Sequence, residues 1–262
     1  MVSQLGPASF VDNSTARPRR YDLVVFNHPL ILGHRGASAS ARENTLGAYA
    51  LAVSQDADGI ELDVRTTKDG ALVLHHDPTI RGVGPIVDKT FEELRTEAAH
   101  VPTLDEMLAV TGDLILNIEI KNQPGEPDHD PEDEVARQVV DWIDTNHLHA
   151  RTIVTSFNWS TTSRVRHLDD RVVTGQLLDR GMPVEDMLVE IATVGHSWVA
   201  PHYSSLDGAA EGLISAAHAR DLRVVVWTLD DLDRIADLAD ASIDAIITND
   251  PAGAVCHLAR LG

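Results

Sequence analysis

The sequence has a single cysteine, Cys256, in 262 residues. One cysteine cannot form an intramolecular disulfide, so the chain lacks the cross-links that stabilise small secreted domains. We interpret Cys256 as a small apolar residue of the last helix. Long apolar runs are also missing, because no segment approaches the roughly 20 residues that a transmembrane helix needs. Residues 1–20 contain no apolar core after a basic start, so we expect a cytoplasmic chain without a secretory signal or stable membrane insertion.

Basic residues are scarce as well. The chain has 21 Lys and Arg against 41 Asp and Glu, which gives a formal net charge of −20. Nucleic acid and anionic membranes repel such a chain, and no basic tract offers them a binding surface. We therefore expect a small-molecule partner rather than nucleic acid. The sequence leaves the oligomeric state open.

Strand and helix patterns alternate about eight times, with no change in composition that would mark a domain boundary. Such alternation predicts a parallel sheet, and eight repeats in this length predict a closed (β/α)₈ TIM barrel, with a doubly wound sheet as the alternative. We expect a mobile leader at residues 1–28 and a single barrel domain at residues 29–262. A hairpin turn at Thr67-Lys68-Asp69-Gly70 and an irregular segment up to residue 102 predict a short insertion after the second strand. Asn44 and Asp130-Pro131 are expected to cap helices.

The segment 58–64 carries two acids in an otherwise apolar strand. Side chains alternate across a strand, so Glu61 and Asp63 should share one side while Ile60, Leu62 and Val64 share the other. Two carboxylates this close repel each other unless a cation, a proton or a basic group lies between them. A hard divalent cation, Mg²⁺ or Ca²⁺, suits oxygen-only ligands. The alternative is a strand end paired with a surface Lys or Arg.

Polar residues recur where predicted strands end. His34-Arg35, Glu61 with Asp63, Glu119 with Lys121, and Trp227 occupy these positions. In a barrel of this kind, chemistry takes place at the carboxyl ends of the strands. The coincidence of these residues on one rim therefore favours a catalytic site over a purely structural role.

Histidine is the usual proton carrier near neutral pH. His34 is notable because glycines flank the His34-Arg35 pair and allow the backbone to approach a ligand closely. His75 and His76 are adjacent, so on an extended strand only one of them can point into the site. Alternation groups His76 with Leu72 and Leu74, and we expect His76 to be the functional one.

These residues together resemble the glycerophosphodiester phosphodiesterase family. The resemblance covers nearly all of the chain from Leu30 onward, and each motif is weak alone whereas the ordered set is strong. The matching segments are Gly33-His34-Arg35-Gly36-Ala37, Glu43-Asn44-Thr45, Ile60-Glu61-Leu62-Asp63-Val64, Thr67-Lys68-Asp69-Gly70, His76-Asp77, Pro102-Thr103-Leu104, Asn117-Ile118-Glu119-Ile120-Lys121, Val226-Trp227-Thr228 and Ile246-Ile247-Thr248-Asn249.

The resemblance implies a (β/α)₈ barrel that hydrolyses glycerophosphodiesters to glycerol 3-phosphate and an alcohol with one divalent cation. It implies that His34 and His76 form the acid/base pair, and that Glu61, Asp63 and Glu119 bind the metal. Arg35 and Lys121 would contact the phosphate. Trp227 would pack on the glycerol or alcohol group, or simply fill the barrel.

The chain departs from the family pattern at three places. Arg42 stands where proline usually precedes Glu-Asn-Thr, the loop after His76-Asp77 is contracted to residues 81–84, and Asn158 replaces an acid. These differences concern substrate preference rather than the reaction. Two other functions remain open, a barrel phospholipase or sphingomyelinase-D-like enzyme and a non-catalytic binding barrel. The aromatic content of 4% and the scarcity of basic residues disfavour a lipid-binding rim.

Overall fold

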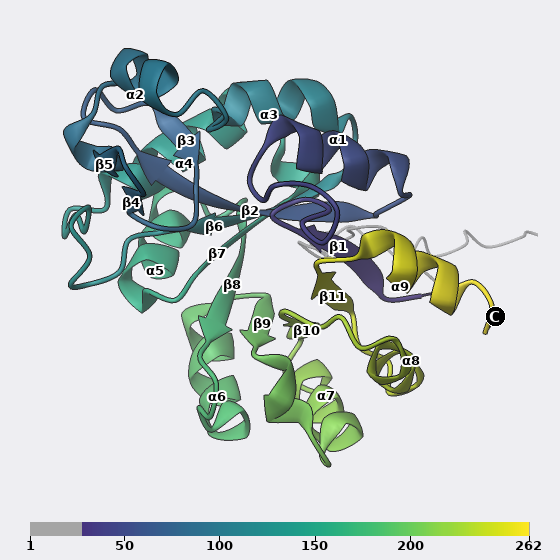
Figure 1. The fold of residues 1–262 in the computed structure, drawn as a ribbon. Coiled ribbons are helices and arrows are strands. Elements are labelled where there is room, and N and C mark those ends of the chain that lie inside the picture. The colour runs from purple at the N-terminus through teal and green to yellow at the C-terminus, as the bar shows by residue number, and fades with distance from the viewer. Residues whose placement is uncertain (1–27, 262) are drawn as a thin grey trace, which may run out of the picture.

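Eight parallel strands form a closed barrel in the computed structural model, which describes residues 28–261. The strands follow one another around the barrel in the order β1, β2, β6, β7, β8, β9, β10 and β11, and β11 pairs with β1 to close it. The helices lie outside the strands (Figure 1). The predicted TIM barrel is confirmed. Except for His28, the predicted leader lies outside the described residues.

The bounds of the strands are β1 Leu30–His34, β2 Gly59–Thr66, β3 Leu72–Leu74, β4 Thr79–Ile80, β5 Gly84–Pro85, β6 Ile115–Ile120, β7 Thr152–Ser156, β8 Val173–Leu178, β9 Trp198–Pro201, β10 Arg223–Val226 and β11 Ala245–Thr248. The α-helices are α1 Leu46–Ser54, α2 Phe91–Glu97, α3 Leu104–Thr111, α4 Glu134–Thr145, α5 Trp159–Leu168, α6 Val184–Val194, α7 Ala210–His218, α8 Leu232–Asp240 and α9 Pro251–Leu258. Three short 3₁₀ helices are η1 Ile86–Asp88, η2 His149–Arg151 and η3 Tyr203–Leu206. None of the helices in residues 28–261 has the length and hydropathy needed to cross a bilayer.

Alternation along β2 divides its side chains as the sequence predicts. Ile60, Leu62 and Val64 are fully buried in the core between the strands and the surrounding helices. Glu61 and Asp63 belong to the opposite, inner face of the strand. Strand β6 follows the same rule, with apolar residues on its outer face. A separate apolar cluster, which includes Leu32, Trp198 and Ile247, fills the inside of the barrel and supports the polar end from below.

The insertion between β2 and α3 contains β3, β4, β5, η1 and α2. Strand β3 runs antiparallel to β2 after a turn in which Gly70 has a φ of +82°, a conformation that favours glycine. The insertion has its own small apolar core, which includes Val73, Ile86 and Leu94. It lies at one side of the barrel (Figure 1). The predicted hairpin insertion is therefore confirmed, and its core fixes the position of the residues that follow β3.

Two expected helix caps are wrong. Thr45, not Asn44, caps α1 by accepting a hydrogen bond from the Ala48 backbone. Helix α4 begins at Glu134, three residues after Pro131, because the Asp130 carboxylate caps a turn by accepting from the backbone of Glu132 and Glu134. In both places a long-range or turn contact overrides the local capping signal.

Gly59 at the start of β2 leaves no room for a side chain. A Cβ there would lie 2.5 Å from the Ile115 carbonyl oxygen and 2.6 Å from Leu32 Cδ2. We predict that Gly59→Ala lowers the free energy of unfolding by about 1–3 kcal/mol, because backbone must shift to admit the methyl group. Gly212→Ala is the matched control, since nothing lies within 4 Å of its added Cβ on α7. In urea unfolding, the free energy of unfolding of this control should rise by about 0.5–1 kcal/mol, because alanine has a higher helix propensity than glycine. Equal effects of the two substitutions would contradict this packing argument.

Candidate active site

The predicted polar residues meet at the carboxyl ends of β1, β2 and β6. In the register of these parallel strands, His34 stands opposite Glu61, and Glu61 stands opposite Asn117. Asp63 stands opposite Glu119 one level further along. The strand-end residues therefore form two adjacent levels inside the barrel mouth, where (β/α)₈ enzymes carry out their chemistry.

Glu61, Asp63 and Glu119 form a buried carboxylate cluster. One carboxylate oxygen from each lies within 4.8 Å of the others. Burial, together with the nearby charge of Asp63, raises the pKa of Glu61 well above its ordinary value. Burial also raises the pKa of Glu119, although Lys121 opposes this effect. Glu61 Oε1 is buried and has no hydrogen-bond partner, so the cluster offers an oxygen that a cation would satisfy.

Two basic side chains contact this carboxylate cluster. Lys121 Nζ lies 2.9 Å from Asp63 Oδ1 and 2.5 Å from Glu119 Oε1. Arg35 Nε lies 3.0 Å from Asp63 Oδ2. Burial alone would raise the pKa of Asp63, but Lys121 and Arg35 hold it well below its ordinary value. Asp63 thus forms ion pairs, but with two largely buried basic residues of the site rather than with the surface Lys or Arg of the alternative, whereas Glu61 keeps a free oxygen.

Asn44 is a site residue that the sequence reasoning missed. Its Nδ2 donates a 2.7 Å hydrogen bond to Asp63 Oδ2, and its Oδ1 accepts one of 2.8 Å from the Tyr49 hydroxyl. The neighbouring Glu43 accepts two hydrogen bonds of 2.9 Å from Arg35 Nη1. The Glu43-Asn44-Thr45 motif is the signal that marks these positions. It holds Asp63 and Arg35 in place rather than only starting a helix.

His34 is the last residue of β1, and its two ring nitrogens face different partners. Its Nδ1 lies 2.7 Å from Asn249 Oδ1, and its Nε2 lies 3.9 Å from Glu61 Oε2. Burial, with the positive charge of Arg35, lowers the pKa of His34. The neutral imidazole is therefore favoured at neutral pH, which suits a group that accepts a proton.

His76 lies just beyond the end of β3. Its Nδ1 lies 2.7 Å from Asp77 Oδ1. Burial lowers the pKa of His76, and the other charges that act on it come from Lys121, Asp63 and Arg35 at the centre of the site. The His75 Nδ1 instead lies 2.8 Å from the Asp77 carbonyl oxygen. The surroundings of His76 are thus those of the site, which fits the residue chosen from the sequence.

Arg65 on β2 is a second residue that the sequence reasoning missed. Its buried guanidinium donates hydrogen bonds of 2.9 and 2.5 Å to the His76 carbonyl oxygen. It also forms ion pairs of 2.9 Å with Glu126 and 2.6 Å with Asp128. Arg65 therefore links the insertion that carries His76 to the loop after β6. Its two partners lie far away in sequence, so no local pattern indicates this role.

Trp227 follows β10 and faces the same site. Its indole Nε1 donates a 2.8 Å hydrogen bond to the Ala200 carbonyl oxygen. Its ring packs edge-on against Phe157 at 5.3 Å and His202 at 5.2 Å between centroids. A small cavity lies between this aromatic group and the acids. The cavity is lined by His34, Glu61, Asn117, Glu119, Thr155, Leu177, Trp227 and Ile247.

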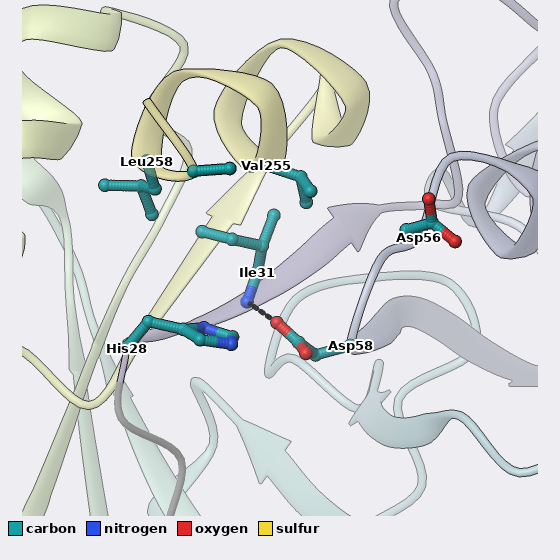
Figure 2. A pocket seen from close by; sticks show the side chains of 7 residues that line it. His28, Ile31, Asp56, Asp58, Val255 and Leu258 are labelled. Atoms are coloured by element: carbon teal, nitrogen blue, oxygen red, sulfur yellow. Dashed lines mark hydrogen bonds between the residues drawn. The ribbon is translucent and has the colours of Figure 1, made fainter. Parts of the chain in front are cut away.

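A second pocket lies near the amino end of β1, between this strand and α9 (Figure 2). Asp58 accepts a 2.8 Å hydrogen bond from the Ile31 backbone there, so its carboxylate ties the start of β2 to β1. Val255 and Leu258 of α9 line the other side. Because barrel chemistry belongs to the carboxyl ends of the strands, we place the candidate active site at the carboxylate cluster rather than here.

Comparison with known proteins gives consistent matches. The sequence model of the glycerophosphoryl diester phosphodiesterase family matches residues 34–253. A glycerophosphodiester phosphodiesterase of Caldanaerobacter subterraneus is 30% identical over 243 residues, which cover 85% of this chain and 94% of that protein. The crystal structure of a glycerophosphodiester phosphodiesterase from Thermotoga maritima has a TM-score of 0.75 at 26% identity and covers 90% of this chain and 100% of that one.

A further structural neighbour comes from Oleispira antarctica. It is a phosphodiesterase in complex with the product sn-glycerol-3-phosphate, with a TM-score of 0.78 at 22% identity, covering 88% of this chain and 97% of that one. At this identity the likeness concerns the fold.

The raised pKa of Glu61 predicts a destabilising charge in the protein without metal. A carboxyl group whose folded pKa is raised contributes stability at pH values below its unfolded pKa, and this contribution is lost as pH rises toward the folded pKa. In excess chelator, Glu61→Gln should therefore unfold at a higher urea concentration than the original chain at pH 8. The difference should shrink toward pH 5. A difference that stays constant with pH would contradict this electrostatic account.

Proposed function

The chain belongs to the glycerophosphoryl diester phosphodiesterase family, and we propose that it hydrolyses glycerophosphodiesters to glycerol 3-phosphate and an alcohol with one divalent cation. The family makes the protein a phosphoric diester hydrolase. The observation that carries the proposal is the carboxylate cluster beside Lys121 and Arg35. An acidic chain can bind a negatively charged phosphate diester only where positive charge outweighs its negative potential locally. Beside this cluster, the side chains of Lys121 and Arg35 supply such positive charge.

We assign Glu61, Glu119 and Asp63 as the metal-binding residues. The oxygen-only donor set fits a hard cation, Mg²⁺ or Ca²⁺, and the unpartnered Glu61 Oε1 supports this fit. When bound, the cation would polarise a phosphoryl oxygen and offset the charge of the acids. Asp63 already has three polar partners, so Glu61 and Glu119 are the ligands with the most freedom to coordinate.

Arg35 and Lys121 are assigned to the phosphate. Both are anchored by Asp63, which fixes where their remaining N–H groups point. A lysine ammonium has three donors, and two of those on Lys121 face Glu119 and Asp63. A guanidinium suits the planar recognition of phosphate oxygens. The ion pairs therefore hold the two basic side chains in fixed positions, from which their remaining N–H groups can bind a phosphate.

The two histidines differ in the partner of Nδ1, and this difference suggests their roles. Asn249 is neutral, and its hydrogen bond only partly offsets the lowering of the His34 pKa by burial and Arg35, so we assign His34 as the base that takes a proton from the attacking nucleophile. Asp77 is a carboxylate, and its hydrogen bond raises the pKa of His76 against the larger lowering by burial and Lys121, so Asp77 opposes the loss of the proton from His76. We assign His76 as the acid that gives its proton to the alcohol oxygen as the bond from phosphorus to that oxygen breaks. Trp227, which lines the small cavity beside the acids, would then pack against the glycerol or alcohol group.

The reaction can be tested with glycerophosphocholine and related diesters. We predict release of glycerol 3-phosphate with Mg²⁺ or Ca²⁺ and a loss of at least about 100-fold in rate after verified metal removal, since a metal provides several kcal/mol of charge stabilisation. Glu119→Gln should weaken metal binding, so that a higher metal concentration is needed for the half-maximal rate in the same assay. Full activity in excess chelator would contradict the metal assignment. A cyclic glycerophosphate as the final product would instead favour the phospholipase-like alternative.

The adjacent histidines provide a second test. His76→Ala should lower kcat by about 10²–10⁴-fold, the usual contribution of a proton-transfer group, and His75→Ala should stay within about a few-fold of the original chain. Both variants should first be compared by thermal melting, because a loss of stability would imitate a loss of catalysis. At matched stability, equal losses or a larger loss for His75→Ala would show that His76 has been assigned wrongly.

A further inference from the structure

We infer that Asp230 is a positioning residue for catalysis, because it fixes, through Asn249, which ring nitrogen of His34 carries the proton. The inference rests on the proposed function in one respect, namely that His34 accepts a proton. Asp230 lies in the loop after β10, and Asn249 lies directly after β11. Neither belongs to the carboxylate cluster, so their effect on the reaction would pass through His34.

The orientation of the Asn249 side-chain amide follows from Asp230. One end of this amide lies 2.7 Å from Asp230 Oδ2. A carboxylate oxygen only accepts hydrogen bonds, so the end that faces it must be the amide nitrogen, Nδ2. Asp230 is itself held by Asn249 and Thr248, because Oδ1 accepts from the Asn249 backbone at 2.8 Å and from the Thr248 hydroxyl at 2.9 Å. The carboxylate therefore determines which way the amide points.

The orientation of Asn249 then determines the tautomer of His34. The amide oxygen, Oδ1, lies 2.7 Å from His34 Nδ1 and also accepts a 2.8 Å hydrogen bond from the Ser38 hydroxyl. An amide oxygen cannot donate, so Nδ1 of His34 must carry the hydrogen. In a neutral imidazole the other nitrogen, Nε2, is then unprotonated. Nε2 is the nitrogen that lies 3.9 Å from Glu61, inside the site. The chain of contacts thus presents a free lone pair where a base is needed.

Asp230→Asn separates this role from a simple tie between loops. The oxygen of the new side chain can keep the two donors that Oδ1 accepts now, which leaves its NH₂ group facing Asn249. Asn249 then meets a donor and turns its own oxygen toward it. Its Nδ2 would face His34, so Nδ1 would become the acceptor and Nε2 would carry the hydrogen. The Ser38 hydroxyl, which now donates to Asn249 Oδ1, would rotate to accept from Nδ2, since a hydroxyl can do either. The substitution therefore keeps the number of hydrogen bonds and inverts the tautomer.

The double variant Asp230→Asn/Asn249→Asp should restore the original tautomer. A carboxylate at position 249 accepts from the amide at position 230 and from His34 Nδ1 at the same time. The proton then returns to Nδ1. Asp233→Asn is the matched control, because it removes one negative charge from an exposed position in the first turn of α8.

The test combines rates with a spectrum of the imidazole ring. In the 262-residue chain labelled with ¹⁵N-histidine, long-range proton–nitrogen NMR identifies the protonated ring nitrogen, and His34→Ala assigns the His34 signals. We expect Nδ1–H in the original chain, Nε2–H in Asp230→Asn and Nδ1–H again in the double variant. At melting temperatures matched to Asp233→Asn, kcat should fall roughly 10- to 100-fold in Asp230→Asn. In the double variant it should recover to within about five-fold at a pH above the His34 pKa, which the carboxylate at position 249 raises.

Two results would overturn the inference. An unchanged His34 ring spectrum in Asp230→Asn shows that Asp230 does not set the tautomer, whatever the rate does. An inverted spectrum with a kcat equal to that of Asp233→Asn shows that the tautomer does not matter for catalysis. If the original chain releases no glycerol 3-phosphate, the proposed function fails instead, and the spectra still decide whether Asp230 controls His34.

Discussion

The burial of three carboxylates at one end of the barrel is the constraint on which the rest of the site depends. Glu61, Asp63 and Glu119 are removed from water by the same strand alternation that builds the core, and buried charges of one sign are costly without partners. Lys121 and Arg35 offset part of this cost through Asp63. The Arg35 backbone has a φ of +54°, in the left-handed region, which is unfavourable for a residue with a side chain. This turn after β1 places the Arg35 guanidinium next to Asp63. What remains uncompensated, above all Glu61, is the part that a substrate-activating cation would use.

The residues around the acids act as supports that come from separate parts of the chain. Asn44 holds Asp63, Arg65 holds the backbone of His76, and Asn249 holds His34. Each uses hydrogen bonds in fixed directions, which is how a barrel rim built from loops achieves defined geometry. The apolar cluster inside the barrel lies beneath these contacts and gives them a rigid base. On the proposed function, stability and activity oppose each other at Glu61, because a neutral side chain would suit the fold better and would bind the proposed cation less well.

The sequence predicted what depends on local periodicity. The period of two along β2 placed Glu61 and Asp63 on one face, and the repeated alternation of strand and helix predicted the barrel, which is confirmed. It did not predict contacts between distant segments. Asn44 and Asp63 are 19 residues apart, Arg65 and Asp128 are 63 apart, and His34 and Asn249 are 215 apart. Asn44 was expected to cap a helix because Asn favours such positions, but the buried Asp63 is a stronger partner for its amide. The roles assigned to the site residues stay predictions.

The most direct measurement is anomalous X-ray diffraction from crystals of the 262-residue chain with Ca²⁺ and glycerol 3-phosphate. The account predicts one ion within about 2.3–2.6 Å of oxygens from Glu61 and Glu119, with the phosphate facing Lys121 and Arg35. A cluster without an ion, in which Lys121 still bridges Glu119 and Asp63 and the phosphate binds elsewhere, would contradict it. That result would mean that the acids serve only to hold the two basic side chains.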